Sequence, residues 1–467
     1  MKKFWLETFY ATIFVFVVMA GVYKITKLNV FNEFDPISKA LSDFELTDMA
    51  FNGIRPDPDS LERIVMDRII LVNIGELNRG EFAQQLQIIN KYKPRVIGID
   101  SYFNCEGGLY NVDDCPQLLL DTLGNLLLSN ALLEARNVVL VSKLLQSDSL
   151  SDLFEADTVE IETDTYDSIE LSDHMFRDSA YSAYANLPTG ADYQEGIKIC
   201  KSVIPKRLVN GKEELAFAVR IAMLFDSIRT KKFLERNNEE EVINYFGNTE
   251  VEDVRLKSLK KMDLGTTDQY RKIAFPTLDV VDVLQERFEP SMIKDNIVLF
   301  GFLGKYLGDP AWNDKFFTPL NKKVGGRANP DMFGLVIHAN IINMILAEDY
   351  INQLPVWGEF VIAFIVCFLN VALFSYINKR LPLYYDGLSV ILQVIEIVIC
   401  SVLVVLLFSY FNFKSSLGIT MIALALVGPC YDTYSGLVKA GIDNLKSKLD
   451  KLKERWLTTK PKGVLND

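Results

Sequence analysis

The sequence predicts an α/β exported domain with a largely parallel sheet flanked by helices, joined to an α-helical membrane domain of four transmembrane helices. Two observations lead to this fold class. Four long apolar runs lie at the two ends of the 467-residue chain, and short apolar segments alternate with helical patterns across residues 60–350. Strand, helix and strand within about 30 residues form a βαβ crossover, which implies parallel strands.

The composition excludes two classes of protein. With 49% hydrophobic and 11% aromatic residues, the chain has enough apolar side chains for a core, which argues against disorder. The formal net charge of −12 argues against a nucleic-acid partner. The length favours two or more structural units.

The first apolar run, residues 4–23, follows Lys2 and Lys3 and is broken only by Glu7. A secretory signal peptide has the same order of charged and apolar residues, but it is shorter and ends in a small-x-small cleavage site. This run matches such a site poorly. An uncleaved transmembrane helix is therefore favoured over a signal peptide.

Three further spans are expected at 356–378, 388–413 and 415–436, each near the ~20 residues that cross a bilayer. Lys379 and Arg380 lie between the second and third spans of the chain, and a Lys-rich tail (437–467) follows the fourth. By the positive-inside rule, both termini and this hairpin face the cytoplasm. Residues 27–354 are then exported.

The exported region has local patterns of strands and helices. Strands are predicted at 68–75, 95–100, 137–141, 241–246 and 297–301, and helices at 81–91, 118–133, 213–228 and, with an amphipathic pattern, 335–346. Residues 146–178 are rich in carboxylates and contain a single Arg177. They form either a solvated acidic insertion, which is favoured, or a calcium site, against which the lack of an EF-hand spacing argues.

Seven segments in order resemble the second type of CHASE domain, a sensory extracellular domain that is associated with bacterial cyclases and histidine kinases. They are ILVNIGE (70–76), PRVIGIDSYF (94–103), INYFG (243–247), FPTLDVVDVL (275–284), IKDNIVLFG (293–301), TPL (318–320) and PDMFGLVIHANIINMIL (330–346). One span before the domain and three after it are also the family's layout. The resemblance implies a periplasmic sensor in a bacterial inner membrane.

The chain departs from the family pattern in three ways. Asn73 stands where members commonly carry an acidic residue on the first strand, and the acidic insertion is unusual. Such domains usually precede a cytoplasmic kinase, cyclase or diguanylate cyclase, whereas about 30 residues follow the last predicted span here. We therefore expect a sensor without a fused effector domain.

Candidate ligand-binding residues follow the predicted strands. Glu76 and Asp100 come after the carboxyl ends of two strands, where ligands of open α/β sheets bind; they either contact a ligand or cap the next helix or turn. The loop Gly301–Gly304 either holds an anion on its amides or forms a tight turn. Further candidates after it are Asp309, Asp314 and Thr318.

The last exported helix adds His338 and Asn340 to the candidates. His338 is expected to hydrogen-bond backbone near the sheet, in the structural role that the resemblance suggests, although its titration range also allows pH sensing. With two histidines in the chain, a three-histidine metal site within one subunit is excluded. No metal, cofactor or enzymatic activity is expected, since no nucleophile with a base is recognisable.

Other residues have roles that stay open. Cys105 and Cys115 either form a disulfide or remain free thiols. Gln393 and Glu396 fall inside the third span, where an ionisable group suggests function, unless the span begins later and leaves Glu396 near the headgroups. The tail has a heptad-like interaction seam formed by Val438, Ile442, Leu445, Leu449, Leu452 and Trp456.

This seam could pair with its own copy, bind a partner or lie on anionic lipid, and pairing or partner binding is favoured. The chain as a whole is expected to detect an extracytoplasmic ligand or partner and to signal to a separate cytoplasmic effector. The main alternative is a scaffold subunit of an envelope complex. Glu396 alone suggests a transporter. Expected partners are membrane lipid, a second copy or a membrane complex, and an effector or envelope protein.

Overall fold

The computed structural model divides into two compact units, residues 51–351 and residues 1–50 together with 352–467. The described residues are 2–26, 47, 51, 60–104, 121–145, 168–189, 198–249, 274–310, 312, 314–321, 329–415, 417–438, 441 and 451. Cys105, Cys115, most of the acidic insertion (146–167) and the tail seam after Val438 lie outside these residues.

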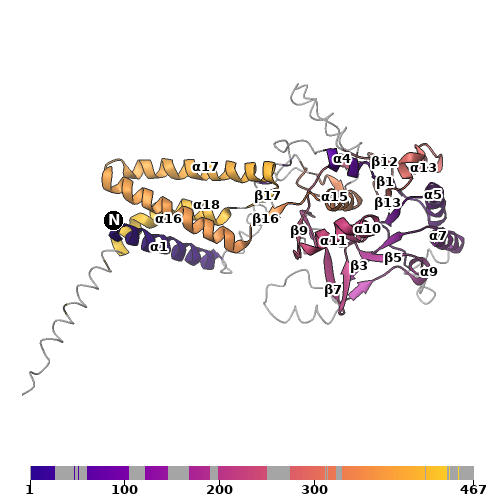
Figure 1. Cartoon of the computed structure of the whole chain (residues 1–467), viewed down its shortest axis with the longest axis horizontal. Coiled ribbons are helices and arrows are strands. Elements are labelled where there is room, and N and C mark those ends of the chain that lie inside the picture. The colour runs from indigo at the N-terminus through magenta and orange to yellow at the C-terminus, as the bar shows by residue number, and fades with distance from the viewer. Residues whose placement is uncertain are drawn as a thin grey trace, which may run out of the picture. The chain divides into compact units, whose positions relative to one another are not determined.

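The unit 51–351 is built on a seven-stranded sheet (Figure 1). Its strands are β1 (Ile69–Asn73), β2 (Val96–Ile99), β3 (Val138–Leu145), β4 (Ser168–Glu170), β5 (Tyr181–Tyr184), β12 (Thr277–Leu278) and β13 (Ile297–Gly301). The order is β12-β1-β13-β2-β3-β4, and β5 also pairs with β3. Every pair is parallel except β3 with β4. The predicted, largely parallel sheet is confirmed.

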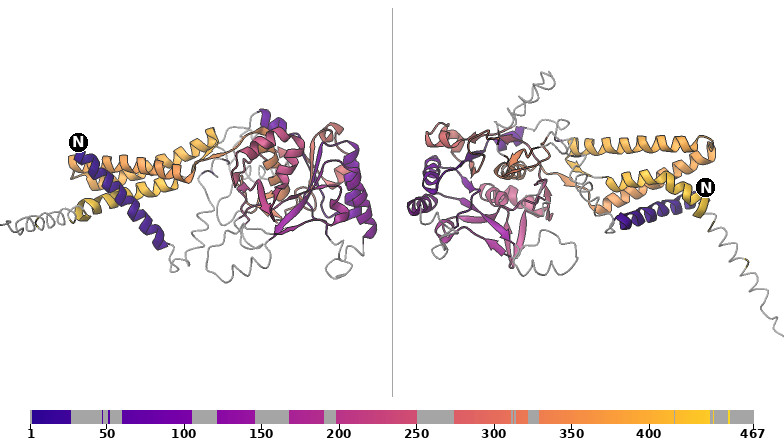
Figure 2. Two further views of the ribbon diagram at one scale, coloured as in Figure 1. Left: turned by 60° about the horizontal axis from the view of Figure 1, so that its bottom comes forward. Right: turned by 180° about the vertical axis from the view of Figure 1, so that it is seen from behind.

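Helices cover both faces of this sheet (Figures 1 and 2). One layer contains α5 (Arg79–Lys91), α7 (Thr122–Glu134), α9 (His174–Arg177), α13 (Val280–Leu284) and α14 (Pro290–Ile293); the other contains α4 (Ser60–Met66), α10 (Phe217–Phe225), α11 (Ser227–Glu235) and α15 (Gly334–Ala347). Alternate residues of β1 pack against the two layers of helices. Ile70 and Val72 face the first layer, and Ile69 and Leu71 face the second. Burial of one such side chain stabilises the fold by about 1.5–3 kcal/mol.

The predicted helix 213–228 is wrong in both bounds. Its first residues belong to β8 (Lys212–Leu215), which pairs with β7 (Lys206–Val209). The turn between them is Asn210-Gly211 with φ of 50° and 77°, the sequence and backbone of a type I′ hairpin. Asp226 then separates α10 from α11 because its Oδ1 accepts the Ile228 and Arg229 amides, each at 3.1 Å.

Two further expectations need correction. In the segment 241–246 only β9 (Glu241–Val242) is a strand, and it pairs with β6 (Ser202–Val203) outside the main sheet. The helix α15 is not amphipathic, because residues 335–347 are all buried. It packs against α4, α10, α11, β1 and β13. A helix enclosed on all sides can be apolar all round.

Short strand pairs complete this unit. They are β10 (Asn248–Thr249) with β11 (Ala274–Phe275) and β14 (Lys315–Phe316) with β15 (Met332–Phe333). The second pair lies in the chain directly before α15.

The other unit is helical. Three of its described helices contain segments long and apolar enough to cross a membrane: α1 (Lys2–Thr26), α16 (Val356–Arg380) and α17 (Tyr385–Phe411). The fourth predicted span corresponds to α18 (Gly418–Thr433), whose 16 residues fall below the ~20 that cross a bilayer; a π-helix at Tyr434–Val438 follows directly. The count of four spans therefore stays a prediction. The helix α18 packs against α1, α16 and α17.

Candidate functional site

Three strands of the sheet end side by side where the sequence predicts a ligand crevice. Because β1, β13 and β2 are parallel neighbours, Asn73, Gly301 and Asp100 meet at one edge. The Asp100 amide donates to the Phe300 carbonyl oxygen at 2.8 Å, which fixes its place beside β13. The strand ends therefore lie side by side as predicted.

The side-chain amide of Asn73 lies between the ends of β1 and β13. The side chain is fully buried. Its Nδ2 donates to Asp279 Oδ1 at 2.9 Å and to the Gly304 carbonyl oxygen at 3.0 Å. Its Oδ1 accepts the backbone amides of Gly75 at 3.0 Å and Leu303 at 2.9 Å. All four hydrogen-bonding positions of the amide are occupied.

Backbone amides in and just after the glycine-punctuated loop Gly301–Gly304 donate to side chains of the chain itself, beginning with the Leu303 amide and Asn73 Oδ1. The Lys305 amide donates to Asp309 Oδ2 at 3.0 Å, and the Leu307 amide to Asp279 Oδ2 at 3.2 Å. Gly304 has φ of +101°, and a Cβ there would lie 2.7 Å from the Asp309 Cβ. The chain's own carboxylates therefore occupy the position of an external anion, and the loop has the geometry of a tight turn.

The two predicted carboxylates at the strand ends have different surroundings. Glu76 is exposed and forms an ion pair with Lys305 at 2.8 Å. Asp100 is half-buried, and burial raises its pKa to about 6, with Asp314 adding to the rise. A Cβ on Gly334 would lie 4.0 Å from Asp100 Oδ2, so this acid adjoins the first residue of α15. Asp314 is exposed, with φ of 65°.

Sequence reasoning missed Asp331, which holds Thr318 in place. Asp331 accepts the Thr318 amide at 2.9 Å and the Thr318 hydroxyl at 2.6 Å, and the Asn321 amide group at 3.3 Å. Burial raises the Asp331 pKa to about 7, although the bonds from Thr318 oppose the rise. The segments TPL and PDMF, quoted above for the resemblance, each contribute one member of this pair. The presence of both segments in the sequence was the signal that could have pointed to the Thr318–Asp331 pair.

His338 does not make the expected backbone hydrogen bond at Nδ1, which has no partner among the described residues. The ring is 3% exposed and packs edge-on against Phe217 at 5.1 Å. Burial lowers its pKa to about 4. Burial therefore favours the neutral imidazole at physiological pH.

Asn340 binds the chain itself. Its Oδ1 accepts the amides of Phe246 at 2.8 Å and Gly247 at 3.2 Å, and its Nδ2 donates to the carbonyl oxygens of Gly247 and Val336. This fully buried side chain holds residues 246–247 against α15. In the described part of the chain, no group of three His, Cys, Asp or Glu side chains is placed to hold a metal ion.

The polar residues of the third predicted span contact the neighbouring helices. Glu396 on α17 accepts a hydrogen bond from Asn370 on α16. Gln393 donates to the carbonyl oxygens of Leu424 at 3.0 Å and Ala425 at 3.2 Å on α18. Both side chains thus join helices, in the manner of polar residues inside membrane bundles.

Comparison with known proteins gives one family. Residues 30–373 match the family model described as CHASE2 domain. No curated protein and no solved structure matches the chain. The matched range contains the whole sheet and every candidate residue of the carboxyl edge.

Replacing Asn73 by Asp should destabilise the unit 51–351 by about 3 kcal/mol, because one oxygen of a buried carboxylate would then face Asp279 and the Gly304 carbonyl oxygen without a donor. Adding Asp279→Asn should restore part of this loss. Thermal unfolding of the full chain in detergent measures both effects. Equal stability of Asn73→Asp and the wild type at neutral pH would contradict the hydrogen-bond assignment.

Replacing Asp100 by Asn should stabilise the chain more at about pH 8 than at about pH 4. With its pKa raised to about 6, folded Asp100 keeps a proton that the unfolded chain loses near pH 4, so its contribution to stability falls as pH rises through this window. The stabilisation by Asp100→Asn at about pH 8 should exceed that at about pH 4 by up to ~3 kcal/mol. Asp295→Asn at an exposed site is the matched control for unfolding measurements. A gain independent of pH would refute the assignment.

Proposed function

The chain belongs to the CHASE2 domain family, whose members are sensory extracellular domains, and on this premise we propose that it is a non-catalytic signal-input protein. In this proposal residues 51–351 detect a periplasmic ligand or partner, and the membrane helices pass the signal to a separate cytoplasmic effector. The protein acts in a bacterial inner membrane as a homodimer or as a subunit of a larger complex. The family match over residues 30–373 is the observation that carries the proposal.

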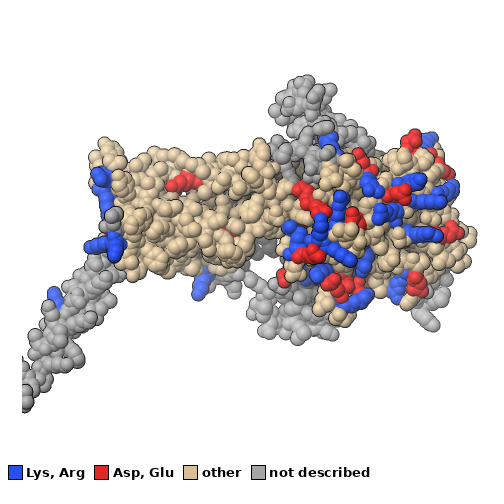
Figure 3. All heavy atoms as spheres, in the orientation of Figure 1, with Lys and Arg blue, Asp and Glu red and all other residues tan. Residues whose placement is uncertain are grey.

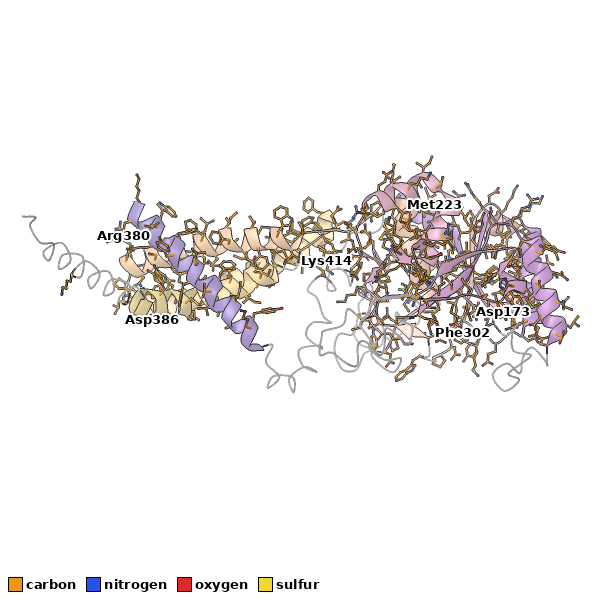
Figure 4. All side chains as sticks on the ribbon, turned by 90° about the horizontal axis from the view of Figure 1, so that it is seen from below. Asp173, Met223, Phe302, Arg380, Asp386 and Lys414 are labelled. Carbon is orange, nitrogen blue, oxygen red and sulfur yellow. The ribbon has the colours of Figure 1, made fainter. Side chains whose placement is uncertain are left out.

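The distribution of charge on the helical unit supports the proposed orientation. Figure 3 shows a broad, mostly tan band with a red carboxylate patch inside it and basic side chains at one end. In Figure 4, Arg380 and Asp386 lie at one end of the helices and Lys414 lies at the other. The hairpin with Lys379 and Arg380 is the more basic turn, which favours its placement in the cytoplasm. The turn at Lys414 then faces the periplasm.

A short parallel sheet suggests how the signal enters the helices. Residues Asn352–Gln353 (β16), just before α16, pair with Phe413–Lys414 (β17), between α17 and α18. The Asn352 amide donates to the Asn412 carbonyl oxygen at 2.8 Å, and the Leu354 amide to the Lys414 carbonyl oxygen at 3.0 Å. A displacement of the segment that leaves the exported domain would therefore move three helices together.

Polar contacts deeper in the bundle would carry this displacement along the helices. The Asn370–Glu396 bond joins α16 to α17, and Gln393 joins α17 to α18. Gly428 allows this last approach, since a Cβ there would lie 3.0 Å from the Gln393 amide group. Hydrogen bonds of this kind help to hold membrane helices together.

The scaffold alternative is favoured by one observation. Four leucines at helical spacing lie on the outer face of α7. Each of them is between 40% and 71% exposed: Leu123, Leu126, Leu127 and Leu133. Exposed apolar patches mark protein contacts. Such a face would suit a constitutive subunit of an envelope complex.

The proposed topology predicts opposite labelling of two exposed positions. In a chain whose native cysteines are replaced by Ser, Ile228→Cys and Leu383→Cys should both be reactive, because the side chains are 71% and 86% exposed. A membrane-impermeant thiol reagent added to intact spheroplasts should label only the first, and lysis should expose the second. Labelling of Leu383→Cys from outside would overturn the orientation.

Signal transfer through β16–β17 predicts that Asn352→Pro uncouples the two units, because proline removes the amide that donates to Asn412. Gln353→Pro is the matched control, since the amide of the intervening residue faces the other edge of the strand. The readout is a fusion of a diguanylate cyclase domain after residue 467, assayed in cells grown in a panel of media.

The wild-type fusion and Gln353→Pro should change output about fivefold or more across the panel, and Asn352→Pro should give constant output. Constant output from the wild-type fusion would count against a sensory role. Equal variation in Asn352→Pro would leave the sensor in place but refute the proposed route.

A further inference from the structure

A cavity of about 640 Å³ opens away from the carboxyl edge of the sheet, between the β4–β5 side and the β7–β8 hairpin. Its apolar wall includes Ile169, Leu171 and Val209. The volume suits a small organic molecule. None of the candidate residues predicted from the sequence lines this cavity.

The charged wall of the cavity contains one cation without a partner. Arg220 belongs to α10, a helix that is otherwise almost entirely apolar. The side chain is half-buried, and its Nε is buried without a hydrogen-bond partner among the described residues. The buried Nε is shielded from the cavity as well as from water, whereas the residue as a whole is half-buried and lines the cavity. Among the described residues the side chain has no hydrogen bond or ion pair that would compete with an anion.

The other two cations of the wall already have contacts. Lys212 pairs with Glu214 at 2.7 Å, and Glu214 is itself buried. An Arg177 Nη2 lies 2.7 Å from Nε2 of His174 on the same short helix. Arg220 is therefore the group in the cavity that is available for a ligand.

The charge of the wall limits the ligand. Arg177, Lys212 and Arg220 face two carboxylates, Asp178 and Glu214, which leaves a net charge of +1. A single negative charge would neutralise the wall, whereas a phosphate dianion would be repelled by the two carboxylates. The planar fork of arginine matches a carboxylate with two parallel hydrogen bonds. Any apolar part of the ligand would contact Ile169, Leu171 and Val209.

We propose that this cavity binds a small organic monocarboxylate, with Arg220 pairing its carboxylate and the apolar wall holding its hydrocarbon part. The cavity joins three elements that a ligand could hold together: β5 at the sheet edge, the β7–β8 hairpin and α10. The helix α10 also packs against α15 in the second layer. The role of this cavity as the ligand site of a sensor rests on the proposed function. Binding of a monocarboxylate can be measured independently of signalling.

The test is thermal unfolding and calorimetric titration of the full chain in detergent with butyrate, isovalerate and benzoate as probes. At least one of them should raise the unfolding temperature, and inorganic phosphate and butylamine should not. Arg220→Gln should weaken binding about tenfold or more. Without ligand this variant should unfold at the same or a higher temperature than the wild type, because a half-buried cation that has no ion pair among the described residues has been removed.

Arg95→Gln, the same substitution at an exposed position outside the cavity, is the matched control and should bind as the wild type does. Binding of none of the three carboxylates, equal binding by Arg220→Gln, or tighter binding of phosphate would each overturn the proposal. These outcomes leave the topology and the fusion response untouched, so failure here is distinguishable from failure of the sensory role.

Discussion

The amide of Asn73 meets groups from three separate segments where the central strands end. A parallel sheet leaves its last carbonyl and amide groups, and the loops that follow them, at one buried edge, where each polar group needs a partner. Asn73 supplies two acceptor and two donor contacts there, to Gly75, Leu303, Gly304 and Asp279. An aspartate could accept but not donate, and Asp279 would then oppose it. The presence of Asp279 thus gives a physical reason for asparagine on this strand.

This arrangement changes where a ligand is expected. The loop amides at the carboxyl edge are satisfied by Asp279 and Asp309, and Asn340 is satisfied by the backbone beside it. The edge therefore has the chemistry of a structural core, apart from the acids Asp100 and Asp331. By contrast, Arg220 at the side of the sheet has a buried nitrogen that nothing in the described chain satisfies. The proposed binding cavity is distinguished by a cation that lines it beside an apolar wall, and not by the position of strand ends.

The two units differ in how motion would pass through them. The unit 51–351 is a sheet packed between two layers of helices, in which α15 is enclosed on all sides, so local changes propagate through rigid contacts. The helical unit has an apolar core shared by α1, α16, α17 and α18, and polar bonds at β16–β17, at Asn370–Glu396 and at Gln393 add directional contacts between these helices. In the proposed function, small shifts of whole helices would carry the signal.

Local pattern in the sequence determined the elements with strong apolar signals. The runs at 69–73, 96–99 and 297–301 are strands, α5 and α7 follow their helical spacing, and the apolar ends give helices suited to a membrane. The family resemblance, confirmed over residues 30–373, came from short segments in a fixed order. Such signals depend on neighbours in the chain, because strand and helix periodicity repeat within a few residues.

Only the tertiary structure decided which distant residues meet. The pairing of β1 with β13, the partners of Asn73, the Thr318–Asp331 bond and the enclosure of α15 all join segments far apart in sequence or depend on packing. The cavity with Arg220 likewise exists only once β5, the β7–β8 hairpin and α10 assemble. Hydrogen-bond partners and desolvation are properties of that assembly, so residue type and spacing alone could nominate Asp100 or His338 but could not say what surrounds them.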